Sequence, residues 1–513
     1  MNGAESLVRT LLTSDIKTCF ANPGTSEMHF VTALDRIPGM RCILGLTESV
    51  VTGAADGFGR MARDPAVTLL HCGPGLANGL SNLHNARRAQ APIVNIVGDH
   101  ATYHQKMDPP LASDAIGWAR GVSAWTRSAT SAATVGRDAA VAIQAARSGN
   151  GQIATLLAPA DTCWDEGGIP GERLAACPPP TVPAHRVREI ANVFRNGDAV
   201  FLLLGGPLLD GALLANARAI ASKTGAKVMA QTFNGRVERG RGRAPIPRMP
   251  YGVDQAIEAL ARTRNLILAG AAAPAAPFAY PGKPGALQPE DATIHVLARP
   301  DEDIRQAIAA LAEELSAGPN RVADAPPPEA VSAGAISPEA VTRTLAALMP
   351  ENSIIIDESV SFGRPFFNGL SSGPRHDWLQ ITGGAIGNGF PMATGAAVAC
   401  PDRRVIALQA DGAGLFTLQA LWTQARERLA VTTVVLANRK YQILLGELAN
   451  VGANPGQTAM DMLDIGRPDI DWVGLARAFG VEAAKAENME QFADLLTTAN
   501  RRSGPFLIEL MTA

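Results

Sequence analysis

Short apolar runs alternate with longer helical patterns along the whole chain, and this alternation limits the folds that it can adopt. Near the N-terminus, apolar runs at 67–72 and 93–98 flank a helix-like segment at 78–90. Similar runs recur at 199–204, 265–270, 353–357, 405–410 and 432–437. Apolar strands joined by helices are typical of parallel sheets that are covered on both faces. The sequence therefore predicts an α/β protein of doubly wound parallel sheets, with ligands beyond the carboxyl ends of the strands.

Two proline-rich segments divide the chain into three blocks. Residues 165–184 and 316–338 each contain a proline triplet, and the second segment has almost no large apolar side chain. Such segments bury too little surface to fold alone and are typical of connectors. The length of 513 residues also fits three domains of about 150 residues each. We therefore expect three doubly wound parallel-sheet domains, at 1–165, 185–315 and 338–513.

Composition excludes several classes of protein. The 45 basic and 48 acidic residues give a net charge of −3, which favours neither nucleic acid nor an anionic membrane as partner. The six cysteines are widely spaced without a CxxC pair, so neither a zinc knuckle nor a disulfide framework is expected. The N-terminal residues lack the apolar core of a signal peptide, and no apolar stretch is long enough to span a bilayer. These features predict a cytoplasmic protein. Its sparse charge also suggests surface that is buried in an oligomer.

The segment 405–441 contains the most informative pattern. An apolar strand ends at Asp411, a glycine-containing turn and a helix at 415–426 follow, and the next strand ends at Asn438. Parallel neighbouring strands would bring both side chains to one edge of the sheet. Their oxygens suit Mg²⁺ or Ca²⁺, and the adjacent backbone N–H groups suit phosphate oxygens. From the pattern alone, an Asp-Gly turn and a strand-end cap explain the same residues equally well.

The spacing from Asp411 to Asn438 resembles the motif of thiamin-diphosphate enzymes, which begins with Gly-Asp-Gly and ends with a double asparagine. Ala410 and Ala437 stand in place of the first glycine and the first asparagine, neither of which binds metal in that family. The resemblance implies a Mg²⁺ site made of Asp411, Asn438 and the backbone carbonyl of Lys440.

Further segments resemble cofactor-contacting loops of the same family. The glycine-rich run at 383–391 resembles the loop that receives the aminopyrimidine, with Ile386 as an apolar wedge and the Gly384 carbonyl as acceptor of the 4′-amino group. Without the resemblance, these glycines would serve tight strand–helix packing. The cofactor contacts that the resemblance implies are Ser361, Gly384, Ile386, Asp411, Gly412, Ala413, Asn438 and Tyr441.

The first block resembles the other half of the family's site. Residues 20–27 look like an early loop, and residues 46–48 look like the start of the helix that carries the activating glutamate. The resemblance implies that Glu48 hydrogen-bonds the pyrimidine N1′ and promotes the imino tautomer that yields the ylid. His71 and Thr25 match a catalytic histidine and serine of the benzoylformate decarboxylase group, so Glu48, His71 and Thr25 are the expected catalytic residues. Without the motif, Glu48 is an acid in the first turn of a helix.

Three positions limit the resemblance or stand outside it. Pro281 lies near the place of a second catalytic histidine of the benzoylformate decarboxylase group, so an identical proton relay is in doubt. His100 and His104 are four residues apart and could share a helical face, but no third metal ligand accompanies them.

The residues past Asn438 and the middle block bear on the subclass. Leu444 stands where pyruvate decarboxylases carry a catalytic glutamate, and the middle block has no FAD signature of the biosynthetic acetohydroxyacid synthases. Ile443, Leu444 and Glu447 are expected to face the substrate. Glu447 could repel a second carboxylate, relay a proton or be a solvated helix residue.

The resemblance runs from Asn22 to residues 503–510 and is to the acetolactate synthase and benzoylformate decarboxylase group. It implies pyrimidine-binding, middle and diphosphate-binding domains, thiamin diphosphate and Mg²⁺ as cofactors, and sites formed between subunits of a homodimer or homotetramer. The implied activity is that of a lyase or carboligase. The ylid adds to a 2-oxo acid, CO₂ leaves, and the enamine is protonated or captured by an aldehyde or a second 2-oxo acid.

Two other functions can be set against this one. A catalytically lapsed protein could keep the cofactor fold for a structural or regulatory role. A nucleotide-binding dehydrogenase is disfavoured, because no GxGxxG follows the first strand.

Overall fold

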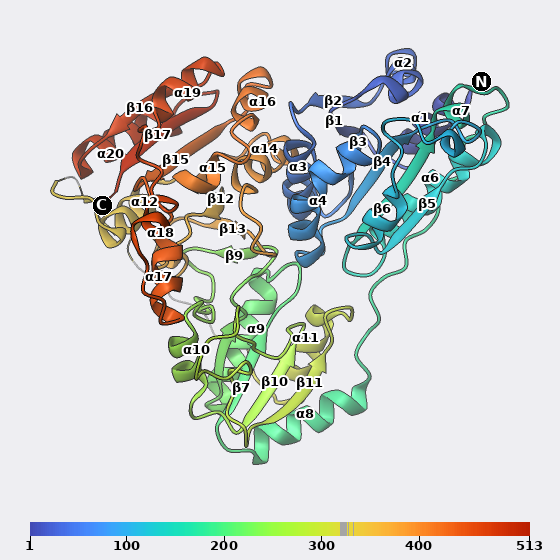
Figure 1. Ribbon diagram of the computed structural model, residues 1–513. Coiled ribbons are helices and arrows are strands. Elements are labelled where there is room, and N and C mark those ends of the chain that lie inside the picture. The colour runs from blue at the N-terminus through green and yellow to red at the C-terminus, as the bar shows by residue number, and fades with distance from the viewer. Residues whose placement is uncertain (319–325, 327, 332, 513) are drawn as a thin grey trace.

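The computed structural model describes residues 1–318, 326, 328–331 and 333–512. It contains three α/β units, each built around its own sheet. In Figure 1 the N-terminal unit is blue and cyan, the middle unit green and yellow, and the C-terminal unit orange and red. The prediction of three doubly wound parallel-sheet units is confirmed.

The N-terminal sheet has six strands, all parallel. Their spatial order is β2 (Arg41–Leu44), β1 (Thr18–Ala21), β3 (Ala66–Leu70), β4 (Ile93–Asp99), β6 (Ile153–Pro159) and β5 (Trp125–Ser128). The surrounding helices are α1 (Gly3–Thr13), η1 (Thr25–Glu27), α2 (Met28–Arg36), α3 (Glu48–Ala62), α4 (Cys72–Arg88), η2 (Gln105–Met107), α5 (Ala115–Arg120), α6 (Ala132–Arg147) and α7 (Ala160–Trp164). The central strands are buried on both faces, which is why they are apolar almost throughout.

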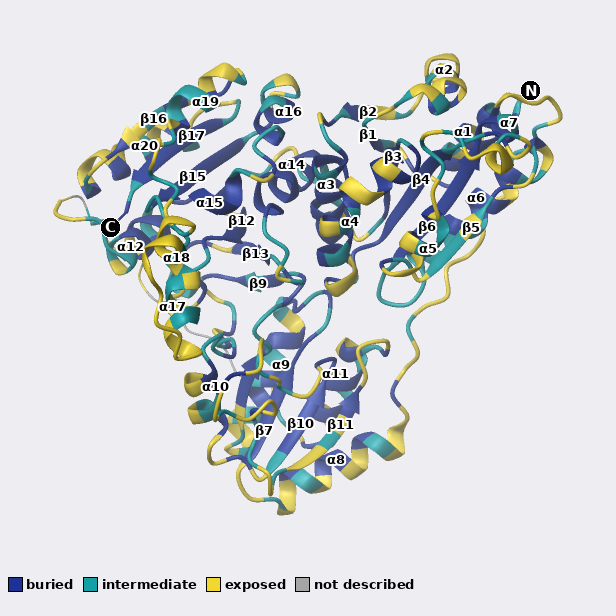
Figure 2. Ribbon diagram, viewed as in Figure 1, coloured by how far each residue is buried: buried dark blue, intermediate teal, exposed yellow. Residues whose placement is uncertain are grey.

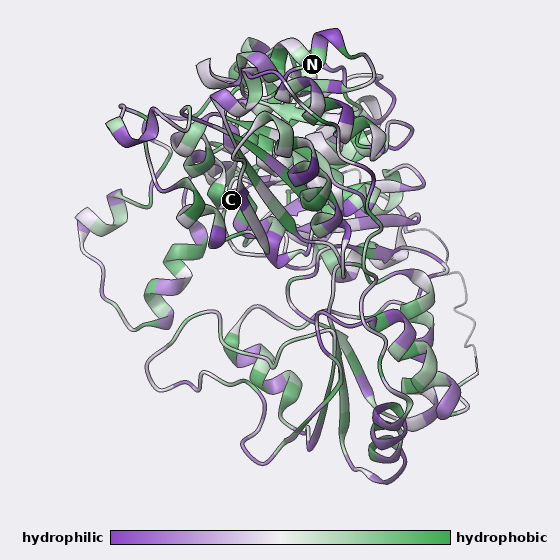
Figure 3. Ribbon diagram, turned by 90° about the vertical axis from the view of Figure 1, so that its right-hand side faces the viewer, coloured by the Kyte–Doolittle hydropathy of each residue, from purple (hydrophilic) through white to green (hydrophobic). Residues whose placement is uncertain are grey.

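The middle sheet has four parallel strands. Their order is β11 (Thr293–Ala298), β10 (Asn265–Ala269), β7 (Val200–Leu204) and β8 (Lys227–Ala230). Its helices are α8 (Ala184–Asn196), α9 (Gly211–Thr224), α10 (Val253–Leu260) and α11 (Ile304–Glu314). Figure 3 shows apolar strands inside the units and hydrophilic residues on the outer helices.

The C-terminal sheet has seven strands, six of them parallel. Their order is β16 (Glu482–Ala486), β17 (Phe506–Met511), β15 (Val431–Ala437), β14 (Val405–Ala410), β12 (Ser353–Glu358), β13 (His376–Gln380) and β9 (Val237–Arg239). Its helices are α12 (Pro338–Leu348), α13 (Phe366–Gly369), η3 (Leu370–Ser372), α14 (Gly389–Ala399), α15 (Asp411–Gly414), α16 (Ala420–Arg426), α17 (Gln442–Asn450), α18 (Gln457–Asp461), α19 (Trp472–Ala478) and α20 (Met489–Asn500). The antiparallel edge strand β9 comes from the middle segment and was not expected from the sequence.

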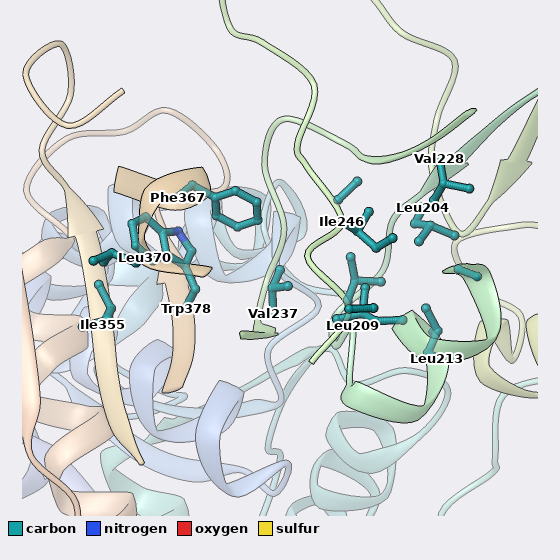
Figure 4. Close-up of a cluster of buried hydrophobic side chains, with 14 of the residues drawn as sticks. Leu204, Leu209, Leu213, Val228, Val237, Ile246, Ile355, Phe367, Leu370 and Trp378 are labelled. Carbon is teal, nitrogen blue, oxygen red and sulfur yellow. The ribbon is translucent and has the colours of Figure 1, made fainter. Parts of the chain in front are cut away.

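Strand β9 joins the middle and C-terminal units through a shared apolar core. Val237 belongs to one buried cluster with Trp378 of the C-terminal sheet and Leu204 of the middle sheet. Figure 4 shows Val237 between the aromatic pair Phe367 and Trp378 on one side and Leu209 on the other. The middle unit is therefore anchored to the C-terminal sheet by packing as well as by its connectors.

Helices α3 and α14 join the N-terminal and C-terminal units at the centre of Figure 1. Their backbones come so close that a Cβ atom at Gly57 would lie 2.1 Å from the Met392 carbonyl oxygen. Beside this contact, the Arg60 guanidinium is fully buried and binds Asp56 through two nitrogens. Arg60 also donates to the Gln380 carbonyl at 2.7 Å, so the ion pair ties α3 to the end of β13.

Local boundaries differ from the sequence-based expectations in two places. The helix expected at 78–90 is α4, which begins at Cys72. The helix expected at 415–426 is interrupted: α15 ends at Gly414 and α16 begins at Ala420. Between them the Thr417 hydroxyl donates to the Gly387 carbonyl at 2.8 Å, so this stretch contacts the glycine-rich loop instead of continuing the helix.

The first expected connector, 165–184, has irregular structure over residues 165–183, and α8 begins at its last residue, Ala184. Of the second, 316–338, residues 319–325, 327 and 332 lie outside the described residues. None of the helices in the described part of the chain combines the length and apolar character that crossing a bilayer requires.

Candidate active site

Four neighbouring strands bring the expected diphosphate-side residues to one edge of the C-terminal sheet. In spatial order the strands are β15, β14, β12 and β13. Asn438 follows β15, Asp411 follows β14, and Ser361 lies three residues past β12. The loop after β13 carries Gly384 and Ile386. Residues far apart in the chain thus lie beyond the carboxyl ends of adjacent parallel strands, where open α/β sheets bind ligands.

Asp411 is a buried carboxylate without a cationic partner. Its side chain is 4% exposed, and its two oxygens accept backbone N–H groups of Gly412 at 2.8 Å and of Arg439 at 2.7 Å. Burial raises the pKa of Asp411, and the backbone hydrogen bonds oppose that rise. No ion pair to Asp411 occurs among the described residues. A bound cation would supply the missing positive charge, so this donor suits a metal ion.

The turn after β15 holds the other two expected metal ligands. The Asn438 side-chain oxygen accepts the Lys440 N–H at 3.1 Å. The Lys440 carbonyl accepts the Gln442 N–H at 3.0 Å and keeps a second lone pair for a ligand. Tyr441 packs so tightly on Gly412 that a Cβ atom there would lie 2.6 Å from the tyrosine ring. The oxygen donors at this edge therefore fit a hard divalent cation completed by phosphate oxygens.

The glycine-rich loop after β13 is held by a buried acid, Glu358, to which the sequence reading gave no role. Its carboxylate accepts the N–H groups of Gly387 and Gly389, each at 2.7 Å, and the side-chain amide of Gln409 at 2.9 Å. Burial raises the pKa of Glu358, and these hydrogen bonds oppose the rise. Gly384 in the same loop has a φ of +76°, a conformation that favours glycine. The sequence feature that could have indicated Glu358 is its place as an acid at the end of a buried apolar strand.

Three asparagines on one face of α4 connect this loop to Glu48. Asn78 donates to the Glu48 carboxylate at 3.1 Å, and Asn82 donates to the Ser49 carbonyl at 2.7 Å. Asn85 donates to the Ala385 carbonyl at 2.7 Å. Residues three and four apart share a helix face, so α4 contacts the start of α3 and the loop together.

Glu48 is buried with one oxygen free. It is the first residue of α3 and is 7% exposed, and Asn78 is the only side chain in the described residues that hydrogen-bonds its carboxylate. A Cβ atom at Gly75 would lie 2.8 Å from Oε1, so a side chain there would displace the carboxylate from its present position. A buried carboxyl with an unpaired oxygen can exchange a hydrogen bond with a ring nitrogen of a bound heterocycle.

Thr25 and His71 line one cavity of about 330 Å³ in the N-terminal unit. The other residues that line it are Ser26, Cys72, His100, Ala101, Tyr103, His104, Leu111, Ala160 and Trp164. His71 Nδ1 lies 2.9 Å from a carboxylate oxygen of Glu27, another residue to which the sequence reading gave no role. The sequence feature that could have indicated Glu27 is its position three residues after Gly24, which is the spacing of a capping box.

His100 and His104 lie in the same cavity with their ring centroids 5.8 Å apart. The only cluster of three potential metal ligands in the described residues is Glu27, His71 and Cys72, so neither histidine of this pair belongs to one. Burial raises the pKa of Cys72 to about 11, which keeps its thiol neutral near pH 7. In the absence of a metal ion, Cys72 is therefore a thiol and not a thiolate.

Helix α17 presents the expected substrate-facing residues. None of its residues is buried, and Leu444 is 42% exposed. Figure 2 shows the helix in the teal and yellow of intermediate and exposed residues. Ile443 is half-buried. Glu447 is not free in solvent, because it accepts the Tyr280 hydroxyl at 2.8 Å. Burial and this acid together raise the pKa of Tyr280 to about 12.

The expected residues therefore form two groups in this chain. Asp411, Asn438 and their neighbours lie on the C-terminal sheet, whereas Glu48, Thr25 and His71 lie on the N-terminal unit. Within the described residues, no hydrogen bond or ion pair joins Asp411 or Asn438 to Glu48, Thr25 or His71.

This fold, with its candidate site residues beyond the carboxyl ends of parallel strands, is typical of α/β proteins that hold a phosphate-bearing cofactor. The model of the thiamine pyrophosphate enzyme N-terminal TPP binding domain matches residues 1–119, and that of the C-terminal TPP binding domain matches residues 368–510. The chain belongs to the thiamine pyrophosphate enzyme family.

Relatives and solved structures agree with this assignment. The chain is 47% identical over 519 residues, covering 100% of the chain and 99% of the relative, to a Mycobacterium tuberculosis protein named "Putative acetolactate synthase large subunit IlvX". It is 29% identical to benzoylformate decarboxylase of Pseudomonas aeruginosa, covering 97% of the chain and 96% of the relative. The fold matches that of Rhodococcus jostii 4-hydroxybenzoylformate decarboxylase with a TM-score of 0.82 at 24% identity, covering 100% and 99% of the two chains. The alternative of a lapsed protein gains no support from these comparisons.

Proposed function

We propose that this enzyme uses thiamin diphosphate and Mg²⁺ to cleave or ligate 2-oxo acids, as an acetolactate synthase-like or benzoylformate decarboxylase-like lyase or carboligase. The observation that carries the proposal is the joint presence of Glu48, Asp411 and Asn438, each in a setting that fits its expected partner. The names of the relatives at 47% and 29% identity supply the substrate class.

The metal site would comprise Asp411, the Asn438 amide oxygen and the Lys440 carbonyl. Asp411 brings the only negative charge among these three ligands, and its burial without a cation supports the proposal. The remaining cofactor contacts would be Ser361, Gly384, Ile386, Gly412, Ala413 and Tyr441. Gly384 leaves its surroundings open, because an added Cβ atom would meet nothing within 4 Å.

When bound, thiamin diphosphate supplies a nucleophilic carbon and stabilises the carbanion that decarboxylation leaves. Glu48 would hold or release the proton that its free carboxylate oxygen shares with the ring nitrogen. Thr25 and His71 would orient the substrate and move a proton inside their cavity. Ile443 and Leu444 would border the substrate from α17, and Glu447 would keep that helix against Tyr280.

We place the working unit in a homodimer or homotetramer. Helices α17 and α18 contain no buried residue in the single chain, and Leu444, Val451, Met460 and Met462 are exposed apolar side chains along and just beyond them. Exposed apolar side chains of this kind fit a surface that a second copy covers. The proposed divisions are a pyrimidine-binding domain at 1–165, a middle domain at 185–315 and a diphosphate-binding domain at 338–513. Six free cysteines support a cytoplasmic location.

The test is CO₂ release from a panel of aliphatic and aromatic 2-oxo acids, with Mg²⁺ and thiamin diphosphate, and with and without an aldehyde acceptor. Glu48→Gln should lower turnover by at least about 100-fold, the usual contribution of general acid–base catalysis. Glu302→Gln is a matched control, because Glu302 is a buried carboxylate of the middle unit. Absence of turnover across the panel, with cofactor bound, would refute the proposal.

A further inference from the structure

Glu27 holds His71 in one orientation. Glu27 ends η1, is 4% exposed, and accepts the Gly24 N–H at 2.7 Å as well as the Ser26 hydroxyl. One of its oxygens lies 2.9 Å from His71 Nδ1 and the other 3.2 Å. The carboxylate is thus fixed by its own loop, and it fixes the histidine in turn.

The ring of His71 is also confined by packing. A Cβ atom at Gly24 would lie 2.2 Å from His71 Cγ, so the loop backbone lies directly on the imidazole. The next residue, Cys72, has a φ of +52°, so the backbone is strained where strand β3 turns into α4. The ring is therefore confined by the Gly24 backbone and by the Glu27 carboxylate at Nδ1.

This geometry determines which ring nitrogen carries the proton. An ionised carboxylate only accepts hydrogen bonds, so the proton shared with Glu27 belongs to Nδ1. Nε2 has no hydrogen-bond partner among the described residues, and His71 lines the cavity with Thr25. His71 therefore offers Nε2 to whatever enters the cavity.

We propose that Glu27 is a positioning residue for proton transfer by His71, holding Nδ1 protonated so that Nε2 gives a proton to the substrate and recovers one from water. This proposal rests on the proposed function. The buried negative charge of Glu27 also offsets the positive charge that His71 carries when both nitrogens are protonated.

The other titratable groups around His71 do not replace Glu27 in this role. Cys72 is a neutral thiol near pH 7, since burial raises its pKa to about 11. Asp99 ends β4, and its carboxylate accepts the His100 N–H at 2.7 Å and the Gln105 amide at 3.0 Å. His100 and His104 line the same cavity, and a histidine carries no negative charge.

The experiment is a double-mutant cycle on the holoenzyme with Glu27→Gln, His71→Ala and the double variant. Glu27→Gln should lower kcat by about tenfold or more, because positioned proton transfer contributes about 100-fold or more. KM should change much less than kcat. In the His71→Ala background, Glu27→Gln should cause no further loss, because its effect passes through the histidine. The pH profile of kcat should also move in Glu27→Gln and not in Glu302→Gln.

Additive losses in the cycle would overturn the proposal, since they would show that Glu27 acts independently of His71. A ¹⁵N-histidine spectrum tests the same point without turnover. His71, assigned by its absence in His71→Ala, should be protonated at Nδ1 in the wild type and should change tautomer in Glu27→Gln. If no 2-oxo acid is turned over but the spectrum is as expected, the proposed function fails and the positioning contact stands. A neutral His71 with its proton on Nε2 and none on Nδ1 in the wild type would refute the positioning role directly.

Discussion

Asp411→Asn removes the only negative charge from the proposed metal ligands and barely changes the size of the side chain. Asp411 accepts one N–H from Gly412 and one from Arg439, so an asparagine amide must turn its NH₂ group toward one of these donors. That unpaired donor costs about 1–3 kcal/mol, while loss of a buried unpaired charge acts in the opposite direction. The cofactor-free protein should therefore keep a melting temperature near that of the wild type.

Binding of Mg²⁺ and thiamin diphosphate should fail instead. Changes in groups that only orient a metal ligand weaken metal binding about 10- to 100-fold, so loss of the charged ligand should cost at least about 100-fold. At a ligand concentration of 100 times the wild-type Kd, stabilisation then falls from about 2.7 to about 0.4 kcal/mol. Thermal unfolding with and without Mg²⁺ and cofactor, together with calorimetric titration of Mg²⁺, measures this difference.

The matched control is Asp471→Asn. Asp471 also accepts a backbone N–H, that of Gly474 at 2.8 Å, but it is exposed at the start of α19. Its substitution should leave the cofactor-induced rise in melting temperature unchanged. Equal Mg²⁺ affinities of Asp411→Asn and the wild type would refute the reasoning, because the buried carboxylate would then have no part in holding the metal.

Two further predictions concern stability. Arg60→Met should destabilise the protein by about 3–5 kcal/mol, because the buried Asp56 carboxylate keeps its hydrogen bond from Asn388 but loses its cationic partner. Arg60→Met combined with Asp56→Asn should recover most of this loss. Urea unfolding followed by tryptophan fluorescence measures both, and equal stability of Arg60→Met and the wild type would contradict the assignment. Burial lowers the pKa of His376 to about 4. Between about pH 6.5 and 4, His376 is therefore neutral in the folded protein, whereas the same histidine in the unfolded chain is protonated. Stability should therefore be lost as the pH falls from about 6.5 to about 4, by about 2 kcal/mol at pH 5. His376→Gln should remove this step from a series of melting curves between pH 7 and 5, and a step of unchanged size would show that other groups cause it.

The positions of site residues could be predicted from the sequence where they depend on a local pattern. Asp411 and Asn438 each directly follow an apolar strand, and β14 and β15 are neighbours, so their closeness followed from periodicity and parallel pairing alone. The pairing of Glu27 with His71 crosses 44 residues and depends on how η1 lies against the start of α4, which no local signal encodes. Strand β9 has only three residues and joins a sheet of another unit, so its pairing is a tertiary effect.

The interrupted helix shows how such a tertiary effect can override a correct local signal. Residues 415–426 have a helical pattern, but Thr417 donates to Gly387 and the helix restarts only at Ala420. A Cβ atom at Gly387 would lie 2.6 Å from Phe416 Cβ, so the interrupted stretch packs directly on the loop. The stretch between α15 and α16 therefore lacks the backbone hydrogen bonds of a continuous helix and instead makes contacts that hold the glycine-rich loop.

Ile386 lies between Ala385 and Gly387 in a loop that is held from several sides. Glu358 binds the loop from the sheet through the N–H groups of Gly387 and Gly389, and Asn85 binds it from the N-terminal unit through Ala385. A side chain that holds a cofactor in one conformation needs a rigid backbone, because a movement of about 1 Å weakens its contact with the cofactor. The buried acid and the asparagine on α4 therefore preorganise the proposed wedge before any cofactor arrives. Because Asn78 on the same helix also contacts Glu48, α4 sets the positions of the proposed wedge loop and of the proposed activating acid together in one chain.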